Sequence, residues 1–258
     1  MIHVTPLETA LLCAAAFVAG TVDAIAGGGG LISVPALLAV GLPPHLALGT
    51  NKGQSVWGSG AALVQYARAG LIERRFALLS FPLALLGSAA GALLVLRVSP
   101  GFLRPLVLVL LVGAAIAVAL ARVPATAEAR PRAATPALLG AVALVIGGYD
   151  GFFGPGTGTF LITAYVALLG FSFRRATANA KVVNFAANLA ALAVFTAQGV
   201  VVWSLAAPML VAQVAGGWTG AHLAVSRGSR FIRVVVFLVA LALVVKVARD
   251  LIDSGSNL

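Results

Sequence analysis

Long apolar stretches, broken by charged residues, proline and glycine, follow one another along almost the whole chain. These breaks define ten segments, and eight of them reach about 19 residues, enough to cross a hydrocarbon core of about 30 Å. The segments lie at 7–26, 31–41, 45–67, 75–96, 102–121, 135–153, 158–170, 175–198, 203–225 and 230–248. The pattern predicts an all-α polytopic membrane protein, with residues 122–134 as its one long polar linker.

Composition supports this prediction. Hydrophobic residues make up 61% of the 258 residues and charged residues only 9%, whereas soluble domains contain about 45–50% and about 25%. Too few polar side chains are present to cover a water-facing globule, so we expect the lipid bilayer to be the main surrounding. The net charge of +10 comes from basic residues that punctuate the apolar segments, a distribution typical of membrane proteins, and no nucleic-acid partner is expected.

The two halves of the chain are a repeat. Gly20-Thr-Val-Asp23-Ala-Ile-Ala-Gly27 matches Gly147-Gly-Tyr-Asp150-Gly-Phe-Phe-Gly154, and after a two-residue insertion a second constant offset persists to the end. The pairs at this second offset are Gly41 and Gly170, Lys52 and Lys181, Gly70 and Gly199, Gly87 and Gly216, Gly91 and Gly220, Phe102 and Phe231, and Arg104 and Arg233. We therefore divide the chain into a first repeat (1–121), a linker (122–134) and a second repeat (135–258).

The basic residues indicate how the repeats are oriented. Fifteen of the 17 lie near segment ends, and if each repeat crosses the membrane an odd number of times, 11 fall on one side and 4 on the other. An even number would give eight and seven, so the positive-inside rule favours inverted repeats. Each repeat is then a glycine-tipped helical hairpin plus three transmembrane helices. The termini are expected outside, with the 68–75 and 122–132 loops inside.

Four charged residues lie deep inside apolar segments, where each costs at least about 2.5–3.5 kcal/mol. They form two repeat-related pairs, Asp23 with Asp150 and Lys52 with Lys181. The short segments 31–41 and 158–170 reach only about half the core, so we expect both lysines to converge with both glycine tips near the membrane centre. Three roles stay open for the aspartates: capping the tips, pairing with the lysines, or carrying protons.

Two ammonium groups and two helix N-termini at glycine tips describe a site for a small anion. Glycines that merely allow close helix packing are the structural alternative. The predicted substrate-binding residues are Lys52, Lys181, Asn51, Asn179, Thr50, Gly28, Gly29, Gly30, Gly156, Thr157 and Gly158. Gln54, Asn184 and Asn188 follow the lysines and are either part of this site or bonded to neighbouring helices.

Other functions have weaker support. A cation or metal carrier could use Asp23 and Asp150, although no metal-ligand cluster accompanies them and Cys13 is the only cysteine. An intramembrane enzyme would need more than Gly58-Ser59-Gly60 and His222, which lack a complete nucleophile motif. We therefore expect a transporter and no enzyme, cofactor or resident metal. The sequence carries no signal for an oligomeric state.

Several of these motifs carry a family resemblance. Asp23-Ala-Ile-Ala-Gly-Gly-Gly-Gly-Leu31, Leu48-Gly-Thr-Asn-Lys52, Tyr149-Asp-Gly-Phe-Phe-Gly-Pro-Gly-Thr-Gly158 and Ala178-Asn-Ala-Lys181 resemble the TauE/SafE family, particularly its YfcA-like branch. The resemblance covers nearly the whole chain. It implies a permease of the bacterial inner membrane that moves small sulfur-containing anions such as sulfite, sulfoacetate or thiosulfate.

The expected mechanism is alternating access around a central site, with the inverted halves rocking about it. Proton coupling through Asp23 and Asp150 is favoured over sodium coupling, because two isolated carboxylates do not form an oxygen-rich sodium cage. The particular anion, and whether it is exported or imported, stay open at this point.

Overall fold

The computed structural model describes residues 4–120 and 135–255, and all the regular elements within those ranges are α-helices. The first half contains α1 (Pro6–Ala26), α2 (Gly30–Ala39), α3 (Pro44–Arg68), α4 (Arg74–Leu96) and α5 (Pro100–Leu120). The second half contains α6 (Pro136–Phe152), α7 (Thr157–Leu169), α8 (Phe173–Ala197) and α9 (Trp203–Gly255). The all-α prediction is confirmed for these residues, and the predicted linker 122–134 lies outside them.

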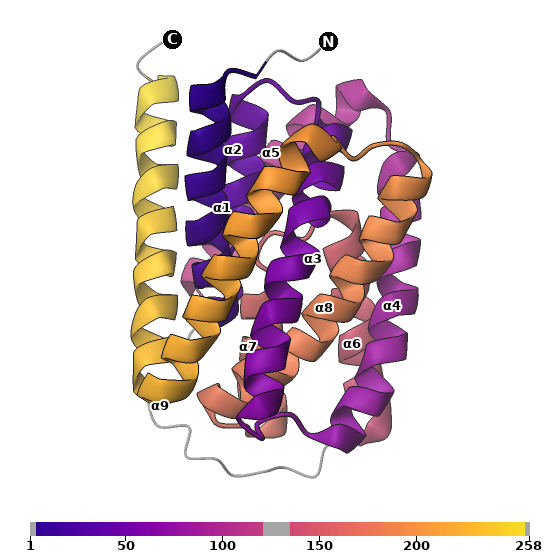
Figure 1. Cartoon of the computed structure of the whole chain (residues 1–258), viewed down its shortest axis with the longest axis vertical. Coiled ribbons are helices and arrows are strands. Elements are labelled where there is room, and N and C mark those ends of the chain that lie inside the picture. The colour runs from indigo at the N-terminus through magenta and orange to yellow at the C-terminus, as the bar shows by residue number, and fades with distance from the viewer. Residues whose placement is uncertain (1–3, 121–134, 256–258) are drawn as a thin grey trace.

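The helix limits follow the predicted segments to within two residues, except in α9. That helix continues to Gly255 and is broken at Gly228, where φ is 70° and ψ is −166°. The two segments predicted at 203–225 and 230–248 are therefore two helical runs joined at a glycine, and they reverse direction there (Figure 1). Glycine has no Cβ and therefore adopts this conformation without strain.

Local signals in the sequence explain where the helices begin and end. Thr5 accepts a hydrogen bond from the backbone of Glu8, whose side chain bonds back to Thr5, so α1 starts with a capping box followed by proline. Thr135 and Ser172 are the N-caps of α6 and α8, and their hydroxyl oxygens accept hydrogen bonds from the backbone of Leu138 and Arg175. Gly27 ends α1 in the left-handed conformation, with φ of 79°.

Glycine brings helices of opposite halves into backbone contact. α1 packs along α9, and α6 packs along α4. A Cβ added at Gly147 would lie 2.9 Å from the backbone of Ala84, and a Cβ at Gly87, Gly91 or Gly151 would lie even closer to the backbone of the facing helix. Gly216 and Gly220 of α9 lie against Phe17 and Thr21 of α1 in the same manner. Small residues spaced four apart allow this close approach in membrane helices.

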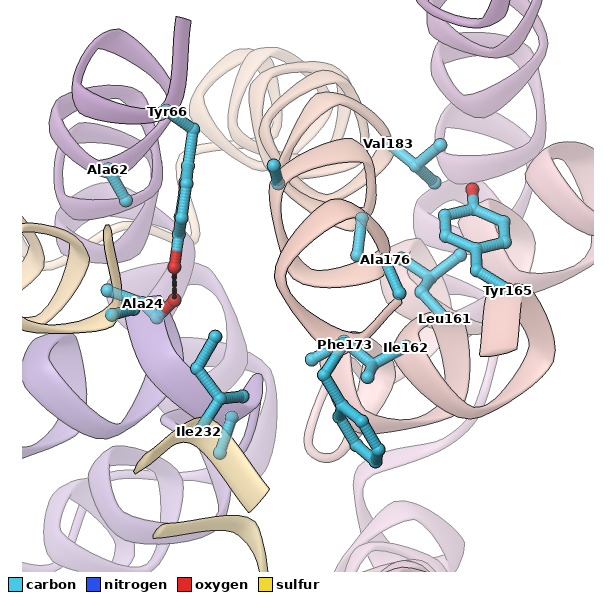
Figure 2. Packing of buried hydrophobic residues seen from close by; sticks show 14 of the residues in the cluster. Ala24, Ala62, Tyr66, Leu161, Ile162, Tyr165, Phe173, Ala176, Val183 and Ile232 are labelled. Atoms are coloured by element: carbon cyan, nitrogen blue, oxygen red, sulfur yellow. Dashed lines mark hydrogen bonds between the residues drawn. The ribbon is translucent and has the colours of Figure 1, made fainter. Parts of the chain in front are cut away.

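A large apolar cluster holds the central helices in register. Figure 2 shows Tyr66 of α3 beside Ala24 of α1, and its hydroxyl donates a hydrogen bond of 2.8 Å to the Ala24 carbonyl. Tyr165 and Ile162 of α7 pack with Val183 of α8 in the same cluster. The cluster thus fixes α1, α3, α7 and α8, the helices that carry or adjoin the buried charges.

The outside of the bundle is apolar, as lipid contact requires. Leu7, Leu78, Val109, Val145 and Val211, from five different helices, are each at least 67% exposed. Within the described residues, four helices are long and apolar enough to span a membrane: Pro6–Ala26, Arg74–Leu96, Pro100–Ala117 and Phe173–Ala197. The multi-pass membrane character predicted from the sequence is confirmed by these helices.

Most of the described arginines gather at one end of the bundle. The α3–α4 and α7–α8 connections and the break in α9 lie at the lower end in Figure 1. Arg175 there forms a 3.4 Å ion pair with Glu73, and the Arg174 backbone donates to Ser229 Oγ. The arginines that flank these connections and the break are Arg68, Arg74, Arg75, Arg174, Arg175, Arg227 and Arg230. The start of α1 and the end of α9 lie at the opposite end.

Candidate functional site

The four buried charged residues form two ion pairs, and each pair joins the two halves of the chain. Lys52 Nζ lies 2.9 Å from Asp150 Oδ2, and Lys181 Nζ lies 2.6 Å from Asp23 Oδ2. The side chains of Lys52, Asp150 and Lys181 are at most 3% exposed, while that of Asp23 is 17% exposed. Of the three roles that the sequence left open for the aspartates, the structure shows pairing.

Glycine makes room for one of these pairs. Asp150 lies in the last turns of α6, and the chain then turns at Gly154, where φ is 95°. A Cβ at Gly154 would lie only 3.0 Å from Lys52 Nζ. A side chain at this position would therefore push the ammonium group away from its carboxylate, so the turn needs glycine for its backbone angle and for the space beside the lysine.

Two asparagines of α8 complete the surroundings of the lysines. Asn188 Oδ1 accepts hydrogen bonds from Lys52 Nζ at 2.9 Å and Ser55 Oγ at 3.2 Å. Asn184 Oδ1 accepts from Lys181 Nζ at 3.4 Å. The repeat equivalents in α3 are Ser55 and Ser59, so α8 supplies amide oxygens to both lysines while α3 supplies none. The sequence left open whether these asparagines are part of the site or bond neighbouring helices. Their contacts with the lysines place both in the site.

The two glycine tips lie against each other, and their predicted convergence is confirmed. Gly27 of the first tip contacts Gly158 of the second. Thr159 Oγ donates a 2.7 Å hydrogen bond to the Ala26 carbonyl, which ties the start of α7 to the end of α1. The backbone hydrogen bonds around the first tip resume at Leu31, which donates to Gly28. The N–H groups of Gly28, Gly29 and Gly30 donate no backbone hydrogen bond within the described residues.

A small polar cavity lies between the ion pairs and the tips. Its volume is about 20 Å³, room for about one water molecule. It is lined by Asp23, Gly29, Gly30, Ser33, Asn51, Lys52, Ser55, Asp150, Gly154, Asn184, Asn188 and Gln213. The lining draws on both halves, and it includes the predicted residues Lys52, Asn51, Gly29 and Gly30 together with both aspartates. Lys181 does not line the cavity itself but is bonded to the lining residue Asp23.

Thr50 and Asn179 were predicted to bind substrate, but their hydrogen bonds point elsewhere. The Val202 N–H donates to Thr50 Oγ at 3.0 Å, and the Glu73 N–H donates to Asn179 Oδ1 at 3.0 Å. Asn179 also donates to the Leu71 carbonyl. These two repeat-related residues each anchor an interhelical loop of the other half, and neither lines the cavity.

The remaining predicted residues shape the second tip or sit beside the first. Thr157 Oγ donates to the Gly154 carbonyl at 2.6 Å, and Gly156 has the left-handed backbone that starts α7. Gly158 provides the contact with Gly27. Gly28 is buried between Gly27 and the cavity-lining Gly29. These residues position the tips and do not line the cavity.

Three cavity residues escaped the sequence analysis: Ser33, Ser55 and Gln213. Ser33 Oγ donates to Asn51 Oδ1 at 2.6 Å, so the short helix of the first hairpin is tied directly to α3. Ser55 lies three residues after Lys52 and therefore shares its helix face. Gln213 is a polar residue within the apolar segment 203–225. This position could have drawn attention to it, but it does not indicate what the residue does.

A helical bundle with an apolar exterior, a buried cross-paired set of charges and glycine-interrupted hairpins has the features of a membrane transporter. The sequence matches the family described as Sulfite exporter TauE/SafE over residues 12–247, and the chain belongs to this family.

Its relatives carry names of the same kind. It is 37% identical over 244 residues to the probable membrane transporter protein ORF9 of Sinorhizobium sp, covering 93% of this chain and 92% of the relative. It is 36% identical over 251 residues to the probable membrane transporter protein YfcA of Escherichia coli K12, covering 96% and 92%. A probable membrane transporter protein of Haemophilus influenzae is 37% identical, covering 93% and 94%. No solved structure matches the chain.

The cross-pairing of the charges predicts which double substitutions restore stability. Lys52→Met should strongly destabilise the protein, by about 3–5 kcal/mol, because Asp150 is left as an unpaired buried charge. Adding Asp150→Asn should recover most of this loss, since the pair is then removed as a unit. The readout is the midpoint of thermal unfolding of purified protein in detergent.

Lys52→Met with Asp23→Asn is the matched control, because it removes the same number of charges from the wrong pair. It should be no more stable than Lys52→Met alone. Recovery with Asp23→Asn instead of Asp150→Asn would contradict the pairing.

Proposed function

We propose that this transporter is a secondary carrier of a small anion, with sulfite or a related organosulfur anion as cargo. The observation that carries the proposal is the pair of buried lysines, each neutralised by one carboxylate of the opposite half. Each buried ammonium has one anionic partner, its other acceptor being a neutral asparagine oxygen, so another anion can take the place of that carboxylate. The family is described as Sulfite exporter TauE/SafE, which supports the choice of a sulfur oxyanion.

Binding of the anion requires the cavity to open. Its volume of about 20 Å³ accommodates about one water molecule, which is less than an anion with three oxygen atoms needs. Opening on one side and then on the other is the alternating-access cycle. We propose that the two halves are inverted repeats that rock about the cavity, because the matching contacts of α1 with α9 and α6 with α4 hold each hairpin to the opposite half.

The competition between cargo and carboxylate supplies a reason for proton coupling. When an anion binds the ammonium group of Lys52, Asp150 loses its ion-pair partner and lies close to a second negative charge. A proton on the carboxylate removes this repulsion. The same holds for Lys181 and Asp23. A monoanion and a proton would then bind together, so that the loaded site carries the same net charge as the empty one.

The lysines also argue against a carrier of cations. A cation that approached Asp23 or Asp150 would have to displace an ammonium group already bonded at 2.6 or 2.9 Å. The anion, in contrast, gains the lysine. Polar groups around the cavity, including Asn51 and the glycine backbone at Gly29 and Gly30, would orient its oxygen atoms.

We propose that the arginine-rich end of the bundle faces the cytoplasm of a bacterial cell and that both termini are periplasmic. Lys and Arg near short loops set the orientation of polytopic proteins. Seven described arginines flank the connections and the helix break at that end, namely Arg68, Arg74, Arg75, Arg174, Arg175, Arg227 and Arg230, and Arg97 is the C-cap at the other end of α4.

Cysteine labelling tests this orientation. In a Cys13→Ala background, Ser99→Cys in the α4–α5 connection should react with an impermeant maleimide added to intact cells, and Ala69→Cys in the α3–α4 connection should react only after permeabilisation. The two sites lie at opposite ends of the same helix α4 and so control for each other. Labelling of Ala69→Cys, but not Ser99→Cys, in intact cells would reverse the proposed orientation.

Removal of one carboxylate should make anion binding easier to see. Asp150→Asn leaves Lys52 without its carboxylate, so the anion-free protein should melt at a lower temperature than the wild type. Added sulfite should raise its melting temperature more than that of the wild type, because the anion no longer competes for the lysine. Equal or smaller stabilisation by sulfite would contradict the displacement mechanism.

Glu73→Gln is the matched control for this experiment. Glu73 is also a carboxylate paired with a basic residue, but its side chain is 42% exposed and lies at the arginine-rich end. Surface pairs contribute little to stability, and the sulfite-dependent shift should stay at the wild-type value in this variant.

Flux measurements test transport itself and its coupling. In proteoliposomes, a proton gradient that is acidic outside should drive sulfite uptake, whereas a sodium gradient should not. Asp23→Asn combined with Asp150→Asn should abolish the pH drive and preserve sulfite exchange, because both lysines remain. Sodium-driven accumulation, or pH-driven uptake unchanged in the double variant, would overturn proton coupling, and absence of any sulfite flux would overturn the choice of cargo.

A further inference from the structure

Gln213 is a buried polar residue of α9 whose side chain faces the cavity. It is only 2% exposed, and its Oε1 atom has no hydrogen-bond donor within the described part of the chain. An acceptor that is buried without a donor lowers stability by about 1–3 kcal/mol. The other amide oxygens of the cavity are satisfied: Asn51 Oδ1 accepts from Ser33 and Gln54, and Asn188 Oδ1 accepts from Lys52 and Ser55.

The surrounding helices hold this side chain in place. A Cβ at Gly58 of α3 would lie 2.5 Å from Gln213 Cγ, and a Cβ at Gly20 of α1 would lie 3.3 Å from its Cδ. The two glycines therefore form a slot that is filled by the stem of Gln213. Because the stem is confined on both sides, the amide group is directed to the cavity and has little freedom to find another partner.

Gln213 has no polar counterpart in the first half of the chain. The equivalent position in the first half is Ala84 of α4, which is fully buried against Gly147. The lysines and aspartates have counterparts in both halves, whereas the Gln213 amide has none. The cavity thus offers a matched set of charges and, in Gln213 Oε1, an acceptor that has neither a repeat counterpart nor a donor within the described residues.

We propose that Gln213 contacts the transported anion and selects anions that carry a hydrogen-bond donor beside their acidic oxygens. The inference rests on the proposed function, because it assumes that an anion occupies this cavity. The lysines would bind the negatively charged oxygens, and a hydroxyl or amino hydrogen of the cargo would satisfy Gln213 Oε1. A protonated oxyanion and an amino-substituted sulfonate both have this chemistry.

Two probes of nearly equal size isolate the donor. Sulfamate and methanesulfonate are both monoanions with an SO₃ group, and they differ in carrying an amino or a methyl group. The wild-type protein should bind sulfamate about threefold to tenfold more tightly, as expected for one additional hydrogen bond. Calorimetric titration of the full-length protein in detergent gives the two dissociation constants, and sulfite serves as the positive control for an occupied site.

Gln213→Met should remove this preference, because methionine fills a similar volume without an amide. Its affinity for methanesulfonate should remain near the wild-type value. Gln54→Met is the matched control: Gln54 is a fully buried glutamine whose Oε1 also lacks a donor within the described residues, but it does not line the cavity. The sulfamate preference should persist in that variant.

The ratio of the two affinities separates a contact with cargo from a structural role, since a change in folding would weaken both probes together. Equal binding of the two probes by the wild type would overturn the inference and leave the anion site intact. An equal loss of preference in both methionine variants would also overturn it. If neither probe nor sulfite binds, the proposed function itself fails.

Discussion

The site depends on one constraint, the two ion pairs that join the halves of the chain. Each lysine finds its carboxylate on the other half, so neither half can bury its own charges in an apolar bundle without the other. An unpaired buried charge is strongly destabilising, whereas a well-bonded pair is tolerated. Docking of the halves is therefore tied to the formation of the site, and any rearrangement that separates them must provide each charge with another partner.

Glycine allows this docking at two levels. Along α1 with α9 and α4 with α6, it lets backbones approach so closely that no side chain fits between them. At the hairpin tips, Gly27 and Gly158 touch, and Gly154 leaves space for Lys52 Nζ. The structural alternative of close packing is thus confirmed at these positions, and anion binding by the glycine tips stays a prediction. A packing surface without large side chains also lets helices shift without unlocking interdigitated groups.

The sequence predicted the helices and singled out the four buried charged residues, because apolar length and isolated charges are local signals. Thr50 and Asn179 were chosen for their closeness to the lysines along the chain, and they do not line the cavity. Two residues in a helix differ by about 200° around its axis, so Thr50 and Asn179 face away from Lys52 and Lys181. Helical neighbours at three, four and seven positions share a face, and that rule finds Ser55, Asn184 and Asn188.

The rest of the site depends on contacts between distant segments. Nothing in the repeat shows that Lys52 pairs with Asp150 and not with Asp23, because both aspartates stand in equivalent sequence surroundings. Gln213 is harder still, since its equivalent is Ala84 and the repeat gives it no counterpart. Its role follows only from the slot formed by Gly20 and Gly58, which lie far from it in the sequence.

Neutrality of the site has a consequence for the proposed cycle. An empty site with two lysines and two aspartates carries no net charge, and a site loaded with a monoanion and a proton also carries none. Moving a net charge through a membrane potential of 100 mV changes the energy by about 2.3 kcal/mol. Both rocking steps of the cycle avoid this term. In this proposed cycle the anion and proton gradients would set the direction of net transport, and the same carrier would export an anion that accumulates inside the cell or import one when the outside is acidic.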